Sequence, residues 1–135
     1  MKQFLDASIL VEACLSQSPH FAAADALVSG SEVFTSAHAL AEAYATLSGD
    51  PRLKLHAVDA AKMIEDLAQT VIIHALGATD YRHLISSAPG KGIRGGTIYD
   101  ALHAESARRC GCGQIRTLNA AHFKHVAPDL AVLGI

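Results

Sequence analysis

The chain has 135 residues, half of them apolar, and its formal net charge at pH 7 is −2. A chain of this length can bury about two-thirds of the surface that it exposes when unfolded, so we expect one domain over residues 1–135. The charge balance excludes a globally basic nucleic-acid-binding protein. No apolar run is long enough for a membrane-spanning helix, and Asp6 comes too early for a secretory signal, so we expect a cytoplasmic protein without a membrane partner.

Strand and helix patterns alternate along the first half of the chain. Ser18 is a good N-cap before Pro19, and Ser36 is a good N-cap for the helix that carries Glu42. The sequence Gly49-Asp50-Pro51 ends that helix. The pattern therefore predicts strands over residues 2–5 and 32–35 and helices over residues 9–15, 19–28 and 36–48.

The alternation continues in the second half. Residues 89–96 are rich in glycine and predict the most flexible segment of the chain. Residues 119–123 read as a short turn. The remaining pattern predicts strands over residues 70–74, 114–118 and 130–133 and helices over residues 55–69, 79–87 and 97–109.

This order of elements predicts an α/β fold with a mainly parallel central sheet. Active sites in such sheets form outside the carboxyl ends of the strands. Asp6 and Asn119 follow predicted strand ends, whereas Glu42 and Asp100 lie in helices that come after such ends. We therefore expect these four side chains to converge at one edge of the sheet.

Three of these residues, Asp6, Glu42 and Asp100, are carboxylates. Carboxylates held close together repel one another, and a hard divalent cation with oxygen ligands is the usual partner of such a cluster. Each acid also has an ordinary explanation. Asp6 suits a helix N-cap, and Asp100 stands where a capping pattern that begins at Thr97 would place an acid. Glu42 would be solvent-exposed, opposite an apolar stripe of Leu40, Tyr44 and Leu47.

Other constellations that mark enzyme sites are missing. The cysteines are odd in number and their spacing fits neither a disulfide framework nor a zinc site: Cys14, Cys110 and Cys112. The pair His122 and His125 lacks a third ligand. A phosphate-transfer motif of the D-x-D type would need an acid at Ser8, and no phosphate-binding G-x-x-x-x-G-K-[ST] loop occurs.

Four motifs occur in a familiar order: Phe4-Leu5-Asp6-Ala7-Ser8, Ala39-Leu40-Ala41-Glu42, Arg94-Gly95-Gly96-Thr97-Ile98-Tyr99-Asp100, and Arg116-Thr117-Leu118-Asn119. With them the chain resembles PIN-domain ribonucleases, specifically VapC-type toxins of type II toxin–antitoxin systems. The resemblance implies a three-layer α/β/α sandwich and an endoribonuclease, a hydrolase of RNA phosphodiesters. It also implies Mg²⁺ as cofactor, with Mn²⁺ as a substitute.

The resemblance further implies roles for individual residues. Asp6 and Asp100 would hold the metal, and Glu42 would complete the acidic cluster, either binding a second ion or orienting the attacking water. The fourth position, often Asp in the family, is Asn119, whose amide brings no negative charge. Ser8 and Thr117 would orient the carboxylates.

Basic residues outnumber acidic ones between Arg82 and Lys124, and a positive surface beside an acidic pocket suits a polyanion. We expect Lys91, Arg94 and Arg116 to contact the RNA backbone. The resemblance implies a cognate antitoxin and a homodimer as partners. One alternative to an active nuclease is a PIN-like module that binds RNA or its partner without cutting, because Asn119 weakens the acidic cluster. Another is a phosphatase-like hydrolase of a small phosphate ester, against which the absence of an acid at Ser8 argues.

Overall fold

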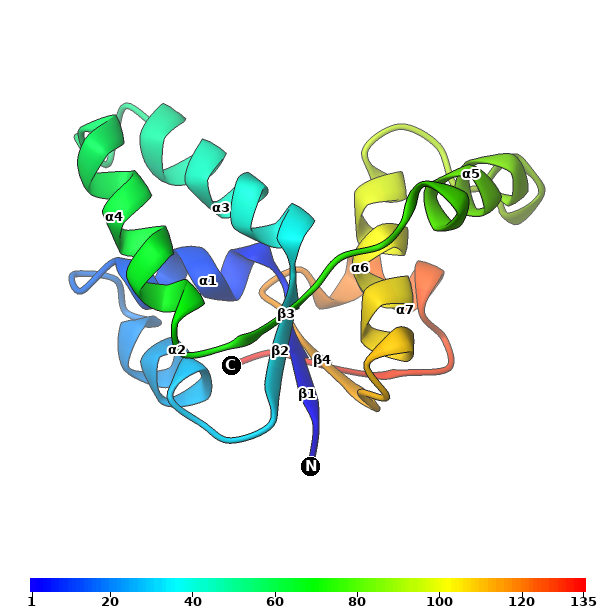
Figure 1. The fold of residues 1–135 in the computed structure, drawn as a ribbon, viewed down its shortest axis with the longest axis horizontal. Coiled ribbons are helices and arrows are strands. Elements are labelled where there is room, and N and C mark those ends of the chain that lie inside the picture. The colour runs from blue at the N-terminus through cyan, green and yellow to red at the C-terminus, as the bar shows by residue number, and fades with distance from the viewer.

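The computed structural model describes residues 1–135, and its centre is a five-stranded sheet (Figure 1). The strand order is β3-β2-β1-β4-β5, and every neighbouring pair is parallel. The predicted α/β class is therefore confirmed, and the sheet is parallel throughout. The strands are β1 (Gln3–Leu5), β2 (Val33–Ser36), β3 (Ile72–His74), β4 (Gln114–Arg116) and β5 (Ala131–Leu133).

Helices cover both faces of the sheet (Figure 1). One face carries α1 (Ala7–Cys14), α2 (Phe21–Val28), α3 (Ala37–Gly49) and α4 (Ala57–Ala68). The other face carries α6 (Thr97–Arg109) and α7 (Ala120–Val126), with α5 (Ala78–Ser87) outside α6 and a short 3-10 helix, η1 (Pro89–Lys91), before it. None of the helices has both the length and the apolar character that a bilayer crossing requires.

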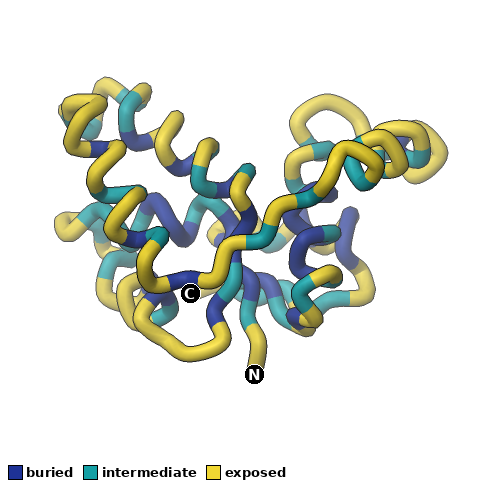
Figure 2. The backbone as a smooth tube through the Cα atoms, viewed as in Figure 1, coloured by how far each residue is buried: buried dark blue, intermediate teal, exposed yellow.

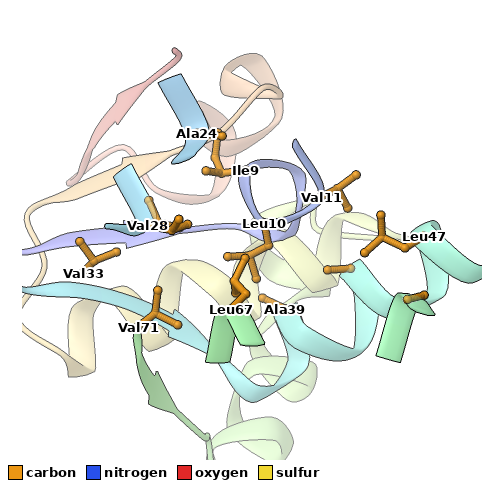
Figure 3. Packing of buried hydrophobic residues seen from close by; sticks show 13 residues of the cluster. Ile9, Leu10, Val11, Ala24, Val28, Val33, Ala39, Leu47, Leu67 and Val71 are labelled. Atoms are coloured by element: carbon orange, nitrogen blue, oxygen red, sulfur yellow. The ribbon is translucent and has the colours of Figure 1, made fainter. Parts of the chain in front are cut away.

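Two hydrophobic clusters flank the sheet because neighbouring strand residues point to opposite faces. Leu5 belongs to the cluster beneath α1–α4, where Ile9 of α1 lies beside Ala24 of α2 and Leu10 points toward Ala39 of α3 (Figure 3). Phe4 belongs to the cluster beneath α6 and α7, with Ile115 and other buried residues. The buried stretches in Figure 2 accordingly lie where the helices face the strands. This packing fixes the carboxyl end of β1 between both helical layers.

Several predicted elements differ from the structure. Residues 119–123 do not form a simple turn but enter helix α7, because Phe123 and Val126, one helical turn apart, are buried against α6. The helix predicted to begin at Pro19 begins at Phe21. Ser18 does not cap that helix; its hydroxyl accepts the His20 N–H at 3.1 Å, which makes a turn before the helix.

The stripe predicted for α3 was also wrong in part. The buried residues of α3 are Ala39, Ala43 and Leu47, whereas Tyr44 is 37 % exposed. Alanines four residues apart let α3 lie close to α1 and α4, which pack against it. Ser36 caps α3 as predicted, since its hydroxyl accepts the Ala39 N–H at 2.9 Å.

Candidate active site

The four predicted site residues line one cavity of about 330 Å³ at the carboxyl ends of the strands. Asp6 directly follows β1, and Asn119 lies shortly after β4. Glu42 reaches the cavity from α3 and Asp100 from α6, so the two helical layers both contribute to it. The chain order of the elements brings these residues together, while their chemical roles stay predictions.

Asp6 is held firmly at the start of α1. It is only 4 % exposed and is the N-cap of the helix. Its Oδ1 accepts hydrogen bonds from Ser8 N (3.0 Å), Ser8 Oγ (2.6 Å) and Ile9 N (3.3 Å). Burial raises the pKa of the Asp6 carboxyl above its ordinary value, although these bonds and the nearby His103 oppose the rise. A buried acid with a raised pKa gains from a neighbouring cation.

Two hydroxyl groups tie Asp6 to the end of β4. Thr117 Oγ1 donates to Asp6 Oδ2 at 2.5 Å and accepts the Asn119 N–H at 2.9 Å. Ser8 Oγ accepts the Leu118 N–H at 2.9 Å while it donates to Asp6. The segment that carries Asn119 is thereby positioned by the same hydroxyls that orient Asp6. Ser8 and Thr117 thus occupy the places expected of groups that orient a carboxylate.

Asp100 has a different environment. It lies in the first turn of α6 but closes no capping box, because Gly96 precedes the helix and no side chain caps it. The capping pattern predicted from Thr97 was therefore wrong. No hydrogen bond reaches the Asp100 carboxylate. Burial raises its pKa, His103 and His122 oppose this effect, and the charges of Asp6 and Glu42 add to it, so that the net pKa is raised.

Glu42 lies between two histidines. His103 Nε2 is 3.2 Å from Glu42 Oε2, and His103 Nδ1 is 3.2 Å from Ser36 Oγ. His38 Nε2 lies 2.7 Å from Glu42 Oε1, but the two atoms lack hydrogen-bond geometry, and both are buried without another partner. Burial raises the pKa of the Glu42 carboxyl, yet His103 and His38 together lower it below its ordinary value. Glu42 is therefore held in its charged form.

Sequence reasoning missed two ionisable residues of this cavity, His103 and Glu12. His103 is 2 % exposed and follows Asp100 by three positions, which places both on one face of α6. That helical spacing was the available signal. Glu12 carried none, since it enters the cavity only because α1 turns back beside β1.

The predicted RNA-contacting residues do not line the acidic cavity. Lys91 lies in η1 beside a separate hollow, and Arg94 is exposed shortly before α6 and makes no hydrogen bond or ion pair. The Arg116 guanidinium is engaged elsewhere: Nε donates to Gln3 Oε1 at 2.8 Å and Nη1 to Gly134 O at 2.9 Å. Lys91 and Arg94 both have side chains without a hydrogen bond or ion pair, and Arg94 is the nearer of the two to Asp100 in the sequence.

The oxygen donors of the cavity suit a divalent cation, but its side chains do not form a complete set of metal ligands. No group of three or more His, Cys, Asp or Glu side chains stands close enough together to hold an ion. Mg²⁺ requires less than that, because it keeps several waters and binds through one or two carboxylates. The mutual repulsion of the acids at Asp100, which no hydrogen bond or ion pair offsets, leaves negative charge for a cation to neutralise. The residues present therefore fit a mostly hydrated Mg²⁺ or Mn²⁺.

Several solved structures share this fold. The toxin VapC20 of Mycobacterium tuberculosis, described as cleaving the sarcin–ricin loop, is 22 % identical with a TM-score of 0.65, over 84 % of this chain and 87 % of that one. VapBC2 of Rickettsia felis, bound to a DNA fragment from its promoter, is 20 % identical with a TM-score of 0.70, over 100 % and 99 %. VapBC-1 of nontypeable Haemophilus influenzae is 17 % identical with a TM-score of 0.67, over 99 % and 98 %.

These identities are low, and the structural likeness by itself establishes only the fold. No curated protein sequence matches the chain. The PIN domain family model, in contrast, matches residues 4–128, which include every residue of the acidic cavity. The strand order, the helices on both faces of the sheet and this match agree with one another. The chain belongs to the PIN domain family.

Proposed function

We propose that the protein is a metal-dependent endoribonuclease and the toxin of a type II toxin–antitoxin module. The observation that carries this proposal is the convergence of Asp6, Glu42 and Asp100 on one cavity in a chain of the PIN domain family. Asp6 follows β1, whereas Glu42 and Asp100 lie on α3 and α6, so the fold itself gathers the three acids. Such a cluster suits the hydrolysis of a polyanion through a bound cation.

Asp6 and Asp100 are the residues that would hold the ion, Mg²⁺ or its substitute Mn²⁺. When bound, such an ion supplies charge neutralisation at the phosphate and a lowered pKa for a coordinated water. Asp6 is already oriented for this task by Ser8 and Thr117. Asp100 has no hydrogen bond to break before it could turn toward a cation.

Glu42 remains to assist the attacking water. Its lowered pKa keeps the carboxylate charged near neutral pH, and the two neighbouring histidines hold it at the wall of the cavity. Asn119 can donate to or accept from the substrate, but its amide adds no charge to the cluster. The cavity thus contains three different carboxylates: Asp6 is held by hydroxyl groups, Asp100 has no hydrogen bond, and Glu42 is fixed by histidines.

The proposed substrate is RNA, and Arg94 and Lys91 are the proposed contacts to its backbone outside the cavity. The proposed partners are a cognate antitoxin and a second copy of the chain. The likeness to VapC20 and to two VapBC structures supports the toxin–antitoxin assignment through the shared fold.

One observation favours a second candidate function, a PIN-like module that binds RNA or a partner protein without cutting it. Asn119 stands where the family resemblance implies an acid, and the side chains do not form a complete metal cage. If a second cation is needed for cutting, this chain lacks a charge with which to hold it.

The test is cleavage of a mixed RNA pool by the purified protein with Mg²⁺, with Mn²⁺ and with EDTA. The Asp100→Asn variant is the inactive form, and Asp59→Asn is its matched control, since Asp59 also lies in a helix first turn but on the exposed surface of α4. We expect metal-dependent cutting that only Asp100→Asn abolishes. RNA binding without any cutting by the wild type would instead establish the binding module.

A further inference from the structure

A second hollow adjoins the acidic cavity. It has a volume of about 430 Å³ and lies between α3 and the beginning of α6. Glu42 and Asp100 line both hollows, so the two spaces meet at the acids. Anything bound in the second hollow would therefore be next to the proposed cleavage site.

Two stacked aromatic rings line this second hollow. The rings of His38 and Tyr99 have centroids 5.2 Å apart and an interplanar angle of 20°. Tyr99 is nonetheless 49 % exposed, so about half of its surface faces solvent. Because His38 covers one face of the phenol ring, the exposed surface comes from the other face and the ring edge. Neither the hydroxyl nor the ring of Tyr99 is part of the hydrophobic core.

The rest of the lining leaves room for a flat group. Ala41, Ala45 and Gly96 contribute little or no side chain, and a Cβ added at Gly96 would meet nothing within 4 Å. The lining contains two carboxylates and no lysine or arginine. A phosphate would be repelled there, whereas an uncharged planar group would not.

We propose that this second hollow binds a nucleobase of single-stranded RNA, stacked on Tyr99, beside the phosphate that is cut. The proposal rests on the proposed ribonuclease function and adds a base-binding subsite to it. Stacking between a base and an aromatic side chain is tolerant of sequence, because every base has a π-face. Tyr99 is then a substrate-binding residue, and His38 supports its ring from behind.

RNA binding tests the subsite more directly than the cleavage rate does. A change at Tyr99 can alter His38, which also contacts Glu42 of the proposed cleavage site. The experiment uses the Asp100→Asn protein, which leaves the RNA uncut, and short single-stranded RNAs with 2-aminopurine at each position in turn. Adding Tyr99→Ala should weaken RNA binding about tenfold or more. It should also abolish the fluorescence quenching of 2-aminopurine at one position of the RNA. Tyr99→Phe, which keeps the ring, should retain both.

Tyr44→Ala is the matched control, since Tyr44 is an exposed tyrosine of α3 that lines neither hollow. An RNA with an abasic nucleotide at the quenched position should bind wild type and Tyr99→Ala equally. Unchanged affinity and quenching in Tyr99→Ala would overturn the subsite. If the wild type then still cuts RNA with Mg²⁺, the ribonuclease function stands without it. If the wild type neither cuts nor binds RNA, both proposals fall together.

Discussion

The acidic cavity has two halves that are built differently. The strand half consists of Asp6, Ser8 and Thr117 at the ends of β1 and β4, where both oxygens of the aspartate are hydrogen-bonded. The helix half consists of Glu42 on α3 and Asp100 on α6, which belong to opposite helical layers. Glu42 is held only by histidines, and Asp100 has no hydrogen bond.

This difference separates two tasks. The strand half orients one carboxylate at the cost of burying it, and it contributes to the stability of the fold as well as to the site. In the helix half, Asp100 carries negative charge that no partner neutralises, which destabilises the metal-free protein and favours a cation. Binding of an ion is then expected to join the two halves.

The largest effect should be the same in both halves, because both aspartates are proposed to hold the ion. Asp6→Ala and Asp100→Ala should each reduce RNA cleavage by about a thousandfold, the loss expected when several kcal/mol of charge stabilisation disappear. Single-turnover rates at saturating Mg²⁺ measure this. A variant that retained a tenth of the wild-type rate would remove its residue from the proposed metal site.

Stability should separate the two halves. Asp6→Ala removes a helix cap and leaves the Thr117 hydroxyl without its acceptor, at a cost of about 3 kcal/mol or a fall in Tm of about 10 °C. Asp100→Ala breaks no hydrogen bond and should leave the Tm of the metal-free protein unchanged or slightly higher. Thermal unfolding in EDTA compares them. Equal falls in Tm would show that the halves are not built differently.

Variants of Thr117 and His103, which hold Asp6 and Glu42 in place, compare how tightly each half positions its carboxylate. Thr117→Val keeps the shape of the side chain but loses the bond to Asp6, and should slow cleavage by about 10- to 100-fold. His103→Gln should cost less, about tenfold or below, because His38 still contacts Glu42. The rate constants, measured on variants whose circular dichroism matches the wild type, provide the test. A larger loss of cleavage rate in His103→Gln than in Thr117→Val would show that the helix half positions its carboxylate more strictly.

The smallest expected effect is a pH dependence that differs in sign within the helix half. The raised pKa of Asp100 favours folding while the group is neutral, and this advantage is lost as the pH rises through that pKa. The lowered pKa of Glu42 contributes stability above its ordinary pKa, which is lost as the pH falls through the lowered value. In EDTA at pH 7, Asp100→Asn should therefore raise the Tm, and Glu42→Gln should lower it.

Both differences should shrink toward acidic pH, where the wild-type carboxylates become protonated. Melting curves measure this between about pH 3, just below the ordinary carboxyl pKa, and about pH 7. Shifts of equal sign for the two variants would contradict the assigned environments.

The sequence predicted the place of the site better than its inner connections. Alternating strand and helix patterns were enough to put Asp6 and Asn119 after strand ends, because parallel strands share one carboxyl edge. The helical identity of residues 120–126 was missed because it depends on burial of Phe123 against α6. The exposed position of Tyr44 depends on how closely α3 packs on its neighbours.

The contacts of the histidines show most clearly what the sequence could not predict. His103 joins Glu42 to Ser36 only because α6 crosses beside β2 and α3, and no local pattern in the sequence reports that contact. The stacking of Tyr99 on His38 likewise brings together residues from the two helical layers. Contacts between layers are set by tertiary packing, whereas strand ends are set by local pattern.

The central claim is that a cation held by Asp6 and Asp100 contacts the phosphate that is cut. Sulfur substitution tests it most directly, because Mg²⁺ binds sulfur poorly and Mn²⁺ accepts it more readily. RNA with phosphorothioate linkages should be cut far more slowly than ordinary RNA in Mg²⁺, and Mn²⁺ should restore the rate. Equal cutting of both RNAs in Mg²⁺, or cutting that continues in EDTA, would contradict the account.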